Sequence, residues 1–141
     1  MLGRFASAGA IWVALGLSSG CATYAKDLER AQRHYEANEF ARALAVLRLL
    51  GEDEAALGEA EQVRYAYLRG MTDYRLSSLT TDHTQTAFRS CARDWLGLAL
   101  EGSKQYGRAL SEGERTRARQ ALADVSAAPG SGGACLTAGE R

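Results

Sequence analysis

Apolar residues recur at steps of three and four along most of the chain, the spacing of one face of an α-helix. The pattern predicts helices over residues 23–37, 39–50 and 59–76, a fourth after a polar loop at 77–83, and a fifth from Ser111 to about Val125. Strand-like alternation is almost absent, and the single proline, Pro129, follows the last of these helices. We therefore expect an all-α fold, a short stack of about five helices in antiparallel hairpins.

Each predicted helix has an apolar stripe that should face the core, and the stripe of the fourth is wide enough to contact two neighbours. Ser111 and Glu114 have the spacing of a capping box, which places the start of the fifth helix. The expected stripes are Leu28, Ala31 and Tyr35; Phe40, Ala43, Leu44 and Leu47; Val63, Tyr67, Gly70, Met71 and Tyr74; Ala87, Phe88, Cys91, Ala92, Trp95, Leu98 and Ala99; and Ala118, Ala121, Leu122 and Val125.

The first 20 residues have the parts of a secretory signal: a basic start at Arg4, an apolar stretch over 5–17, and small residues before Cys21. The apolar stretch is too short to cross a membrane, which takes about 20 residues. The small residues directly before a cysteine resemble the signal of a bacterial lipoprotein, although Ser18 stands where that family usually has leucine. The alternative is an ordinary signal peptide that leaves an unmodified thiol.

Resemblance to lipoproteins implies that Cys21 carries acyl chains such as palmitate and tethers the mature protein to a membrane. The residue after Cys21 is Ala22. An aspartate at this position would imply retention at the inner membrane. The resemblance therefore implies a cell-envelope protein, more consistent with the outer than with the inner membrane, whose domain lies in the periplasm.

Length and charge restrict the possibilities further. The chain has 17 basic and 17 acidic residues, and removal of a signal containing Arg4 leaves 16 against 17. This balance gives no reason to expect a nucleic-acid partner, which demands an excess of basic charge. We expect a signal peptide at 1–20, one helical domain at 21–125 and a flexible tail at 126–141, where Ala, Gly and Ser surround Pro129.

The two predicted hairpins share a repeated sequence pattern. Ala31, Tyr35, Ala43 and Leu47 recur in order as Gly70, Tyr74, Ala87 and Cys91, with a longer inner loop the second time. The first unit, 28–50, resembles a tetratricopeptide repeat, in which small residues let two helices approach closely. The second unit is degenerate, and a generic helical bundle is the alternative.

Residues that could perform chemistry do not form a recognisable site. His34 and His83 have no partner at metal-ligand spacing on the same helical face, and no nucleophile or phosphate-binding motif is present. His34 is expected to be a partly buried helix residue, and Asp82 or Thr81 is expected to cap the fourth helix. We expect no enzymatic activity, cofactor or metal; an unrecognised enzyme or ligand carrier, with an apolar pocket between the third and fourth helices, is a further alternative.

Two cysteines remain after Cys21. A disulfide between Cys91 and Cys135 would fasten the tail to the fourth helix and stabilise the fold by ~4 kcal/mol in the chain-entropy model. A buried free Cys91 with an incidental Cys135 is the alternative.

The resemblance to tetratricopeptide repeats implies a concave groove lined by the first helix of each unit, which binds another protein. The lysine and asparagine by which some members hold a terminal carboxylate have no counterpart here. Alternatively, the chain is a structural accessory or assembly subunit of an envelope machine such as a pilus, secretion or motility apparatus. The expected groove positions are Leu28, Gln32, Tyr35, Glu36, Arg64, Tyr67, Met71, Tyr74 and Arg75.

Overall fold

The computed structural model describes residues 20–127 and residue 135. The described residues form five α-helices and no strand, so the all-α fold is confirmed. In chain order the elements are α1 (Gly20–Glu36), α2 (Phe40–Gly51), the single 3₁₀ turn η1 (Glu54–Ala56), α3 (Glu59–Leu79), α4 (Thr84–Gln105) and α5 (Glu112–Ala127). Residues 1–19 of the expected signal segment, 1–20, lie outside the described residues.

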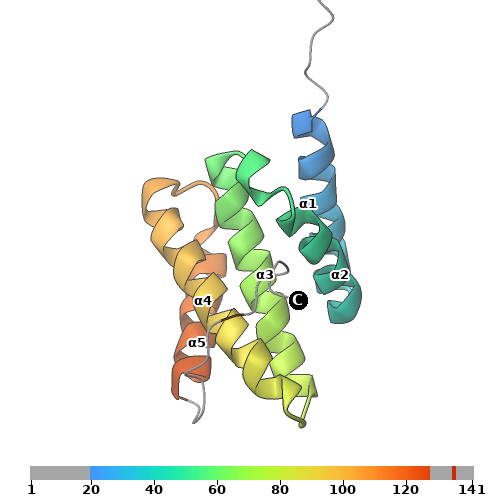
Figure 1. Cartoon of the computed structure of the whole chain (residues 1–141). Helices are drawn as coiled ribbons and strands as arrows, with labels where there is room; N and C mark the ends of the chain where they lie inside the picture. The colour runs from blue at the N-terminus through green and yellow to red at the C-terminus, as the bar shows by residue number, and fades with distance from the viewer. Residues whose placement is uncertain (1–19, 128–134, 136–141) are drawn as a thin grey trace, which may run out of the picture.

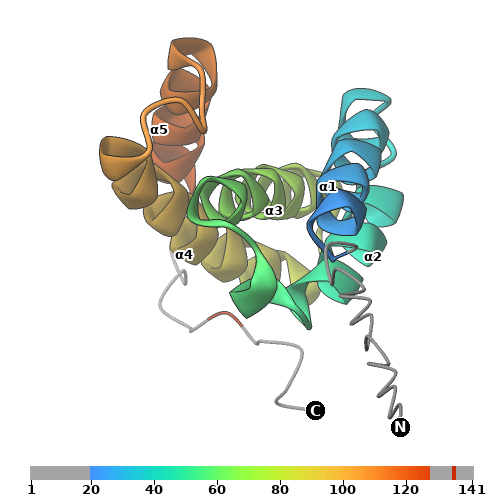
Figure 2. The ribbon, with the colours of Figure 1, turned by 90° about the horizontal axis from the view of Figure 1, so that it is seen from above.

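Helix α3 is the centre of the molecule and contacts each of the other four helices (Figure 1). Its most extensive interface is with α4, and α1 and α5 stand on either side of it (Figure 2). Burial on several sides explains why Tyr65, Leu68 and Thr72 are all at most 2 % exposed although they lie outside the single stripe that the sequence indicates. The central helix therefore has contacts all round, while the outer helices bury one face each.

A tight turn joins α1 to α2. Asn38 adopts a left-handed backbone with φ of 60°, a conformation that asparagine tolerates better than most residues. The N–H of Glu39 donates to the carbonyl of His34 at 2.8 Å, and the Glu39 carboxylate lies 2.6 Å from Nδ1 of His34. His34 is thus a half-buried helix residue, as predicted, and it helps to hold the turn.

The α3–α4 interface depends on a residue without a side chain. A Cβ atom added to Gly70 would lie 2.7 Å from Cγ of Leu96 and 2.9 Å from the Leu96 backbone nitrogen. Ala92, Leu96 and Ala99 are fully buried along α4. The prediction that Gly70 marks a close approach of two helices is confirmed.

The buried face of α4 differs from the predicted one at several positions. Leu98 is 60 % exposed and Ala87 is also exposed, whereas Leu96, absent from the predicted stripe, is buried. Of the two residues that the predicted repeat places in correspondence with the fully buried Ala43 and Leu47, Cys91 is buried and Ala87 is exposed, whereas Ala92 and Leu96 are fully buried. The reason is that the close contact at Gly70 fixes which turn of α4 faces α3.

Helix α3 continues further than predicted, because residues 77–79 belong to it and only 80–83 form the loop. Ser77 is buried and satisfies its hydroxyl by donating to the carbonyl of Tyr74 at 2.7 Å, so a serine does not interrupt the helix. The residue directly before α4 is His83, which makes no side-chain capping bond, and Asp82, one residue earlier, accepts from the N–H of Thr84 at 2.8 Å.

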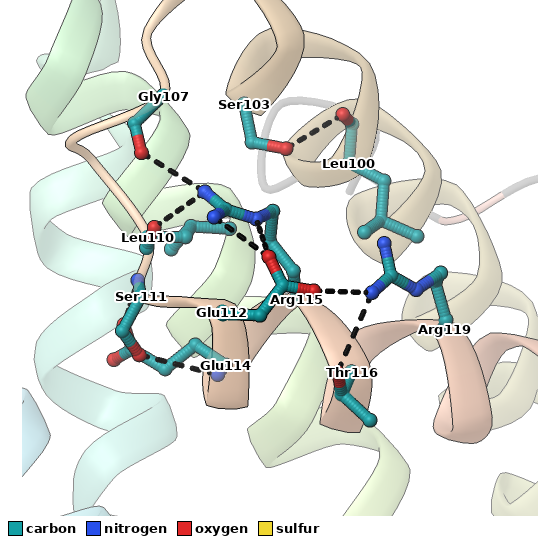
Figure 3. Close-up of polar contacts among 10 residues, drawn as sticks. All are labelled: Leu100, Ser103, Gly107, Leu110, Ser111, Glu112, Glu114, Arg115, Thr116 and Arg119. Atoms are coloured by element: carbon teal, nitrogen blue, oxygen red, sulfur yellow. Dashed lines mark hydrogen bonds and ion pairs between the residues drawn. The ribbon is translucent and has the colours of Figure 1, made fainter.

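The capping box of α5 is also confirmed. The N–H of Ser111 donates to the Glu114 carboxylate at 2.8 Å, and the N–H of Glu114 donates to the Ser111 hydroxyl at 3.2 Å. Arg115 is half-buried and donates to the carbonyls of Gly107 and Leu110 at 2.9 and 2.7 Å (Figure 3). This arginine holds the loop between α4 and α5 in place.

The structure joins Cys91 and Cys135 in a disulfide across a sequence separation of 44, the first of the two alternatives for these cysteines. The N–H of Cys135 donates to the Asp94 carboxylate at 3.0 Å. The expected tail begins later than predicted, because Ser126 and Ala127 complete α5. Its other residues, 128–134 and 136–141, lie outside the described part.

At the other end, α1 starts at Gly20, so Cys21 lies in its first turn, and the side chain of Cys21 lies outside the description. Among the described residues, no helix combines the length and apolar character needed to cross a bilayer.

Candidate functional site

A hollow is bordered by residues of α1, α3 and α5. The ribbon shows α1 and α5 standing on either side of α3 (Figure 2). The hollow consists of two adjoining depressions of about 360 and 250 Å³ that share Tyr35, Arg75 and Arg117. We call this continuous hollow the groove. All eight proposed binding residues other than Leu28 border it: Gln32, Tyr35, Glu36, Arg64, Tyr67, Met71, Tyr74 and Arg75. Leu28 is instead buried in the core and borders a separate depression, so its expected place in the groove is wrong.

One end of the groove is crossed by a polar bridge centred on Arg64 of α3. Its guanidinium donates to the Glu114 carboxylate on α5 at 3.0 Å and to Oε1 of Gln32 on α1 at 2.5 Å. The amide of Gln32 in turn donates to the Glu36 carboxylate at 2.7 Å. Three helices are therefore linked by one arginine, which fixes the separation of the two groove walls at this end.

The middle of the groove is aromatic and basic. The rings of Tyr35 and Phe40 meet edge to face with centroids 5.5 Å apart, and the guanidinium of Arg75 lies 5.7 Å from the centroid of the Phe40 ring. Across from them, Nε of Arg117 donates to the hydroxyl of Tyr67 at 3.4 Å. Both arginines are exposed, so their guanidinium groups are accessible from the groove.

The other end is bordered by Met71, Tyr74, Gln120 and Ala121. The Tyr74 hydroxyl donates to the Asp124 carboxylate of α5 at 2.8 Å, so this hydroxyl already has a partner. Met71 is 4 % exposed and forms part of the floor.

The tyrosines, which the sequence allows either as core or as groove residues, divide between the two roles. Tyr67 is 3 % exposed and belongs to the core, with its hydroxyl reaching the groove floor. Tyr35 and Tyr74 are half-buried and present one side to the groove. The groove therefore has a rigid aromatic floor and accessible aromatic edges.

Electrostatic surroundings shift the pKa values of several groove residues. Burial raises the pKa of the Tyr35 hydroxyl, and the charges of Arg75 and Arg117 oppose that effect. The hydrogen bond to Asp124 raises the pKa of Tyr74. Burial alone would raise the pKa of Glu114, but the hydrogen bonds from Ser111 and the charge of Arg64 outweigh it, and the pKa is lowered. Glu114 is thus held as a carboxylate by its partners.

Sequence analysis missed the wall formed by α5. Glu114, Arg117 and Gln120 lie along the edge of the stripe that contains the buried Ala118 and Ala121, and polar residues at such an edge resemble an ordinary solvated face. The order of the helices could have indicated this wall. Helices α1 and α3 are the first helices of two successive hairpins, and α5 begins the next unit, so α5 should border the same groove.

A second polar cluster lies inside the fold, away from the groove residues. Nε of Arg69 donates to the Asp73 carboxylate at 3.1 Å, and both side chains are buried. The Arg69 guanidinium lies 5.7 Å from the centroid of the Trp95 ring, which meets the Tyr65 ring edge to face. Burial raises the pKa of Asp73 to about 6, although the charge of Arg69 opposes the shift.

Other candidate chemistry stays sparse in the described part of the chain. His83 is an exposed residue at the start of α4, and no group of three or more His, Cys, Asp or Glu residues there could hold a metal ion. A depression of about 260 Å³ between α3 and α4 is bordered by polar residues such as Glu54 and Gln62 as well as by Trp95 and Leu98. The depression at the place where the sequence allows an apolar ligand pocket is thus bordered by both polar and apolar residues.

Comparison with known proteins finds no protein-family model, no curated protein and no solved structure that matches this chain.

Proposed function

We propose that this chain is a lipid-anchored protein of the bacterial envelope that binds another protein in the groove between α1, α3 and α5. The observation that carries the proposal is the convergence of eight residues, selected for their pattern, on one hollow. Those residues come from α1 and α3, which are separated in sequence by α2. The third wall is α5, the helix that follows the second hairpin.

The composition of the groove suits protein binding. Tyrosine and arginine combine a broad contact area with specific hydrogen-bond donors and are over-represented among residues that dominate binding energy. Tyr35, Tyr74, Arg75 and Arg117 all reach the groove from three different helices. Tyr35 and Tyr74 are already held by packing against neighbours, so a partner immobilises few additional side chains on binding.

A tether through Cys21 is part of the proposal and rests on the resemblance of the signal segment to that of lipoproteins. The anchor and the groove have separate tests, since the groove can bind a partner whether or not the chain is acylated. The test of acylation is given with the predictions below.

Site-specific photocrosslinking in living cells tests the binding role. A photoreactive amino acid at Tyr35 or Gln120 places the probe in the groove, and matched controls at Ala45 and Leu49 place it on exposed parts of α2. We expect one defined adduct from the groove positions. In a chain that carries the probe at Tyr35, Gln120→Trp should fill the groove and abolish this adduct. Adducts spread over the α2 positions and the groove alike would contradict this role and favour a structural subunit of a larger assembly.

A further inference from the structure

The acidic groups around the groove are each bonded to a donor on the protein itself. Glu114 accepts from Arg64, Glu36 accepts from Gln32, and Asp124 accepts from Tyr74. These carboxylates are thus engaged before any partner arrives.

Among the described residues, only Glu114 of these three acids is paired with a cation, and two exposed basic groups of the groove are likewise without a charged partner. No carboxylate in the described part of the chain forms an ion pair with Arg75 or Arg117. Arg75 lies over the Phe40 ring, and Arg117 donates to the Tyr67 hydroxyl, a neutral group, at 3.4 Å. Both border the two adjoining depressions together with Tyr35, so two guanidinium groups that have no ion-pair partner among the described residues approach one part of the groove from α3 and α5.

We propose that Arg75 and Arg117 bind the side-chain carboxylates of an acidic segment of the partner protein, an inference that rests on the proposed function of the groove. A guanidinium presents its N–H groups in a planar fork that fits a carboxylate with two parallel hydrogen bonds. Charge complementarity of this kind also excludes partners that present basic residues to the same place. The aromatic floor beside the two arginines supplies contact area for the neighbouring apolar residues of the segment.

The position of the two arginines decides which part of the groove holds the acidic residues. Near Arg64 the positive charge is offset by Glu114 at 3.0 Å. The depression bordered by Met71, Tyr74, Gln120 and Ala121 contains Arg75 and Arg117, and the carboxylate beside it, Asp124, is bonded to the Tyr74 hydroxyl at 2.8 Å and is not itself among the bordering residues. The acidic residues of the partner therefore lie toward this end, away from the polar bridge.

Binding of two matched pools of short synthetic peptides tests the inference. The pools are acetylated and amidated at their ends and differ only in two central positions, glutamate in one and glutamine in the other. Fluorescence anisotropy with the folded, oxidised protein should show that the glutamate pool binds about tenfold more tightly, as one or two charge-assisted hydrogen bonds imply. Rising salt should weaken this preference.

Matched variants locate the effect. The double variant Arg75→Gln/Arg117→Gln should lose the preference for glutamate, whereas Arg42→Gln/Arg119→Gln should keep it. The control removes the same charge from exposed arginines that do not border the groove. All four positions are exposed, and equal melting temperatures would show that both variants are folded.

Each remaining outcome overturns the inference in a distinct way. If both pools bind equally and Gln120→Trp abolishes that binding, the groove binds peptides without recognising their carboxylates. The inference about Arg75 and Arg117 then fails, while the proposed function of the groove stands. If neither pool binds, the inference and the peptide-binding role of the groove fail together. A third pool, the glutamine peptides with a free terminal carboxylate in place of the amide, tests for binding of a chain end. If this pool binds more tightly than the amidated glutamate pool, a chain end and not acidic side chains occupies the site.

Discussion

Gly70 and Leu96 meet where the two longest helices cross, and there is no room between them for a side chain. The missing Cβ of Gly70 would lie within 3 Å of two side-chain atoms of Leu96 and of its backbone nitrogen. A flexible side chain can move aside, but the backbone of α4 can move only with the whole helix. This contact therefore fixes how α4 packs against the central helix.

Gly70→Ala should destabilise the protein by ~1–3 kcal/mol, because the added methyl group overpacks the helix crossing. A loss of that size lowers the melting temperature by roughly 5–15 °C in a domain of this length. Gly97→Ala is the matched control, since nothing lies within 4 Å of the Cβ it would add. In a helix interior alanine is favoured over glycine by ~1 kcal/mol, so the control should melt at or above the wild-type temperature. Identical melting of Gly70→Ala and wild type would contradict the observed packing.

Reduction of the Cys91–Cys135 disulfide should lower the free energy of unfolding by about 4 kcal/mol, as the closure of a loop with a sequence separation of 44 implies. Urea denaturation with and without reductant measures the difference. Cys135→Ser is the control, and it should match the reduced wild-type protein in both conditions. Quantitative alkylation of both thiols without reductant, in protein taken from the envelope, would show that the bond is not formed there.

Stability should depend on the ionisation of Asp73. Its pKa is raised from 3.8 to about 6 by burial, so the folded protein binds this proton more tightly than the unfolded chain does. Between about pH 4 and pH 6 the folded state holds more protons, and the free energy of unfolding should fall as pH rises, by up to about 3 kcal/mol.

Comparing wild type with Asp73→Asn separates the contribution of Asp73 to the pH dependence of the free energy of unfolding from the contributions of other acidic residues. The stability of wild type relative to this variant should decline from pH 4 to pH 6 in urea titrations. Asp53→Asn, which removes an exposed carboxylate, controls for the loss of one charge. A wild-type minus Asp73→Asn difference that stays constant over this range would show that Asp73 ionises alike in the folded and unfolded states.

Cys21→Ser should yield a protein that is either uncleaved or soluble, and in both cases unacylated. Mass spectrometry of the membrane fraction measures the added mass on the wild-type chain, and detergent partitioning measures its anchoring. Recovery of the variant with wild-type mass and partitioning would exclude acylation at Cys21. Because this substitution leaves the groove intact, binding of the glutamate peptides should not change.

Local rules predicted the helices well because each has a stripe, a cap or a turn residue of its own. Asn38, Asp82 and Ser111 all mark a helix boundary through hydrogen bonds or backbone conformation within a few residues. The buried face of α4 was predicted less well, since the choice of Leu96 over Leu98 depends on Gly70, 26 residues earlier.

The groove was predicted from one side only. The residues of α1 and α3 follow from the order of the repeat, whereas Glu114 and Arg117 are polar residues whose role depends on which helix α5 faces. The bond between Arg64 and Glu114 joins residues 50 apart in the sequence, and no local pattern indicates it.

The start of α1 at Gly20 limits the reach of the protein if Cys21 carries the lipid. Helix α1 continues without interruption from Cys21 into the groove wall at Gln32 and Tyr35. At a rise of 1.5 Å per residue, these two positions lie on the order of 20 Å along the helix from the anchored residue. With no spacer between them, the groove can sample only a thin layer next to the bilayer. A partner must then enter that layer itself, as a membrane protein or as a segment extended toward the lipid surface.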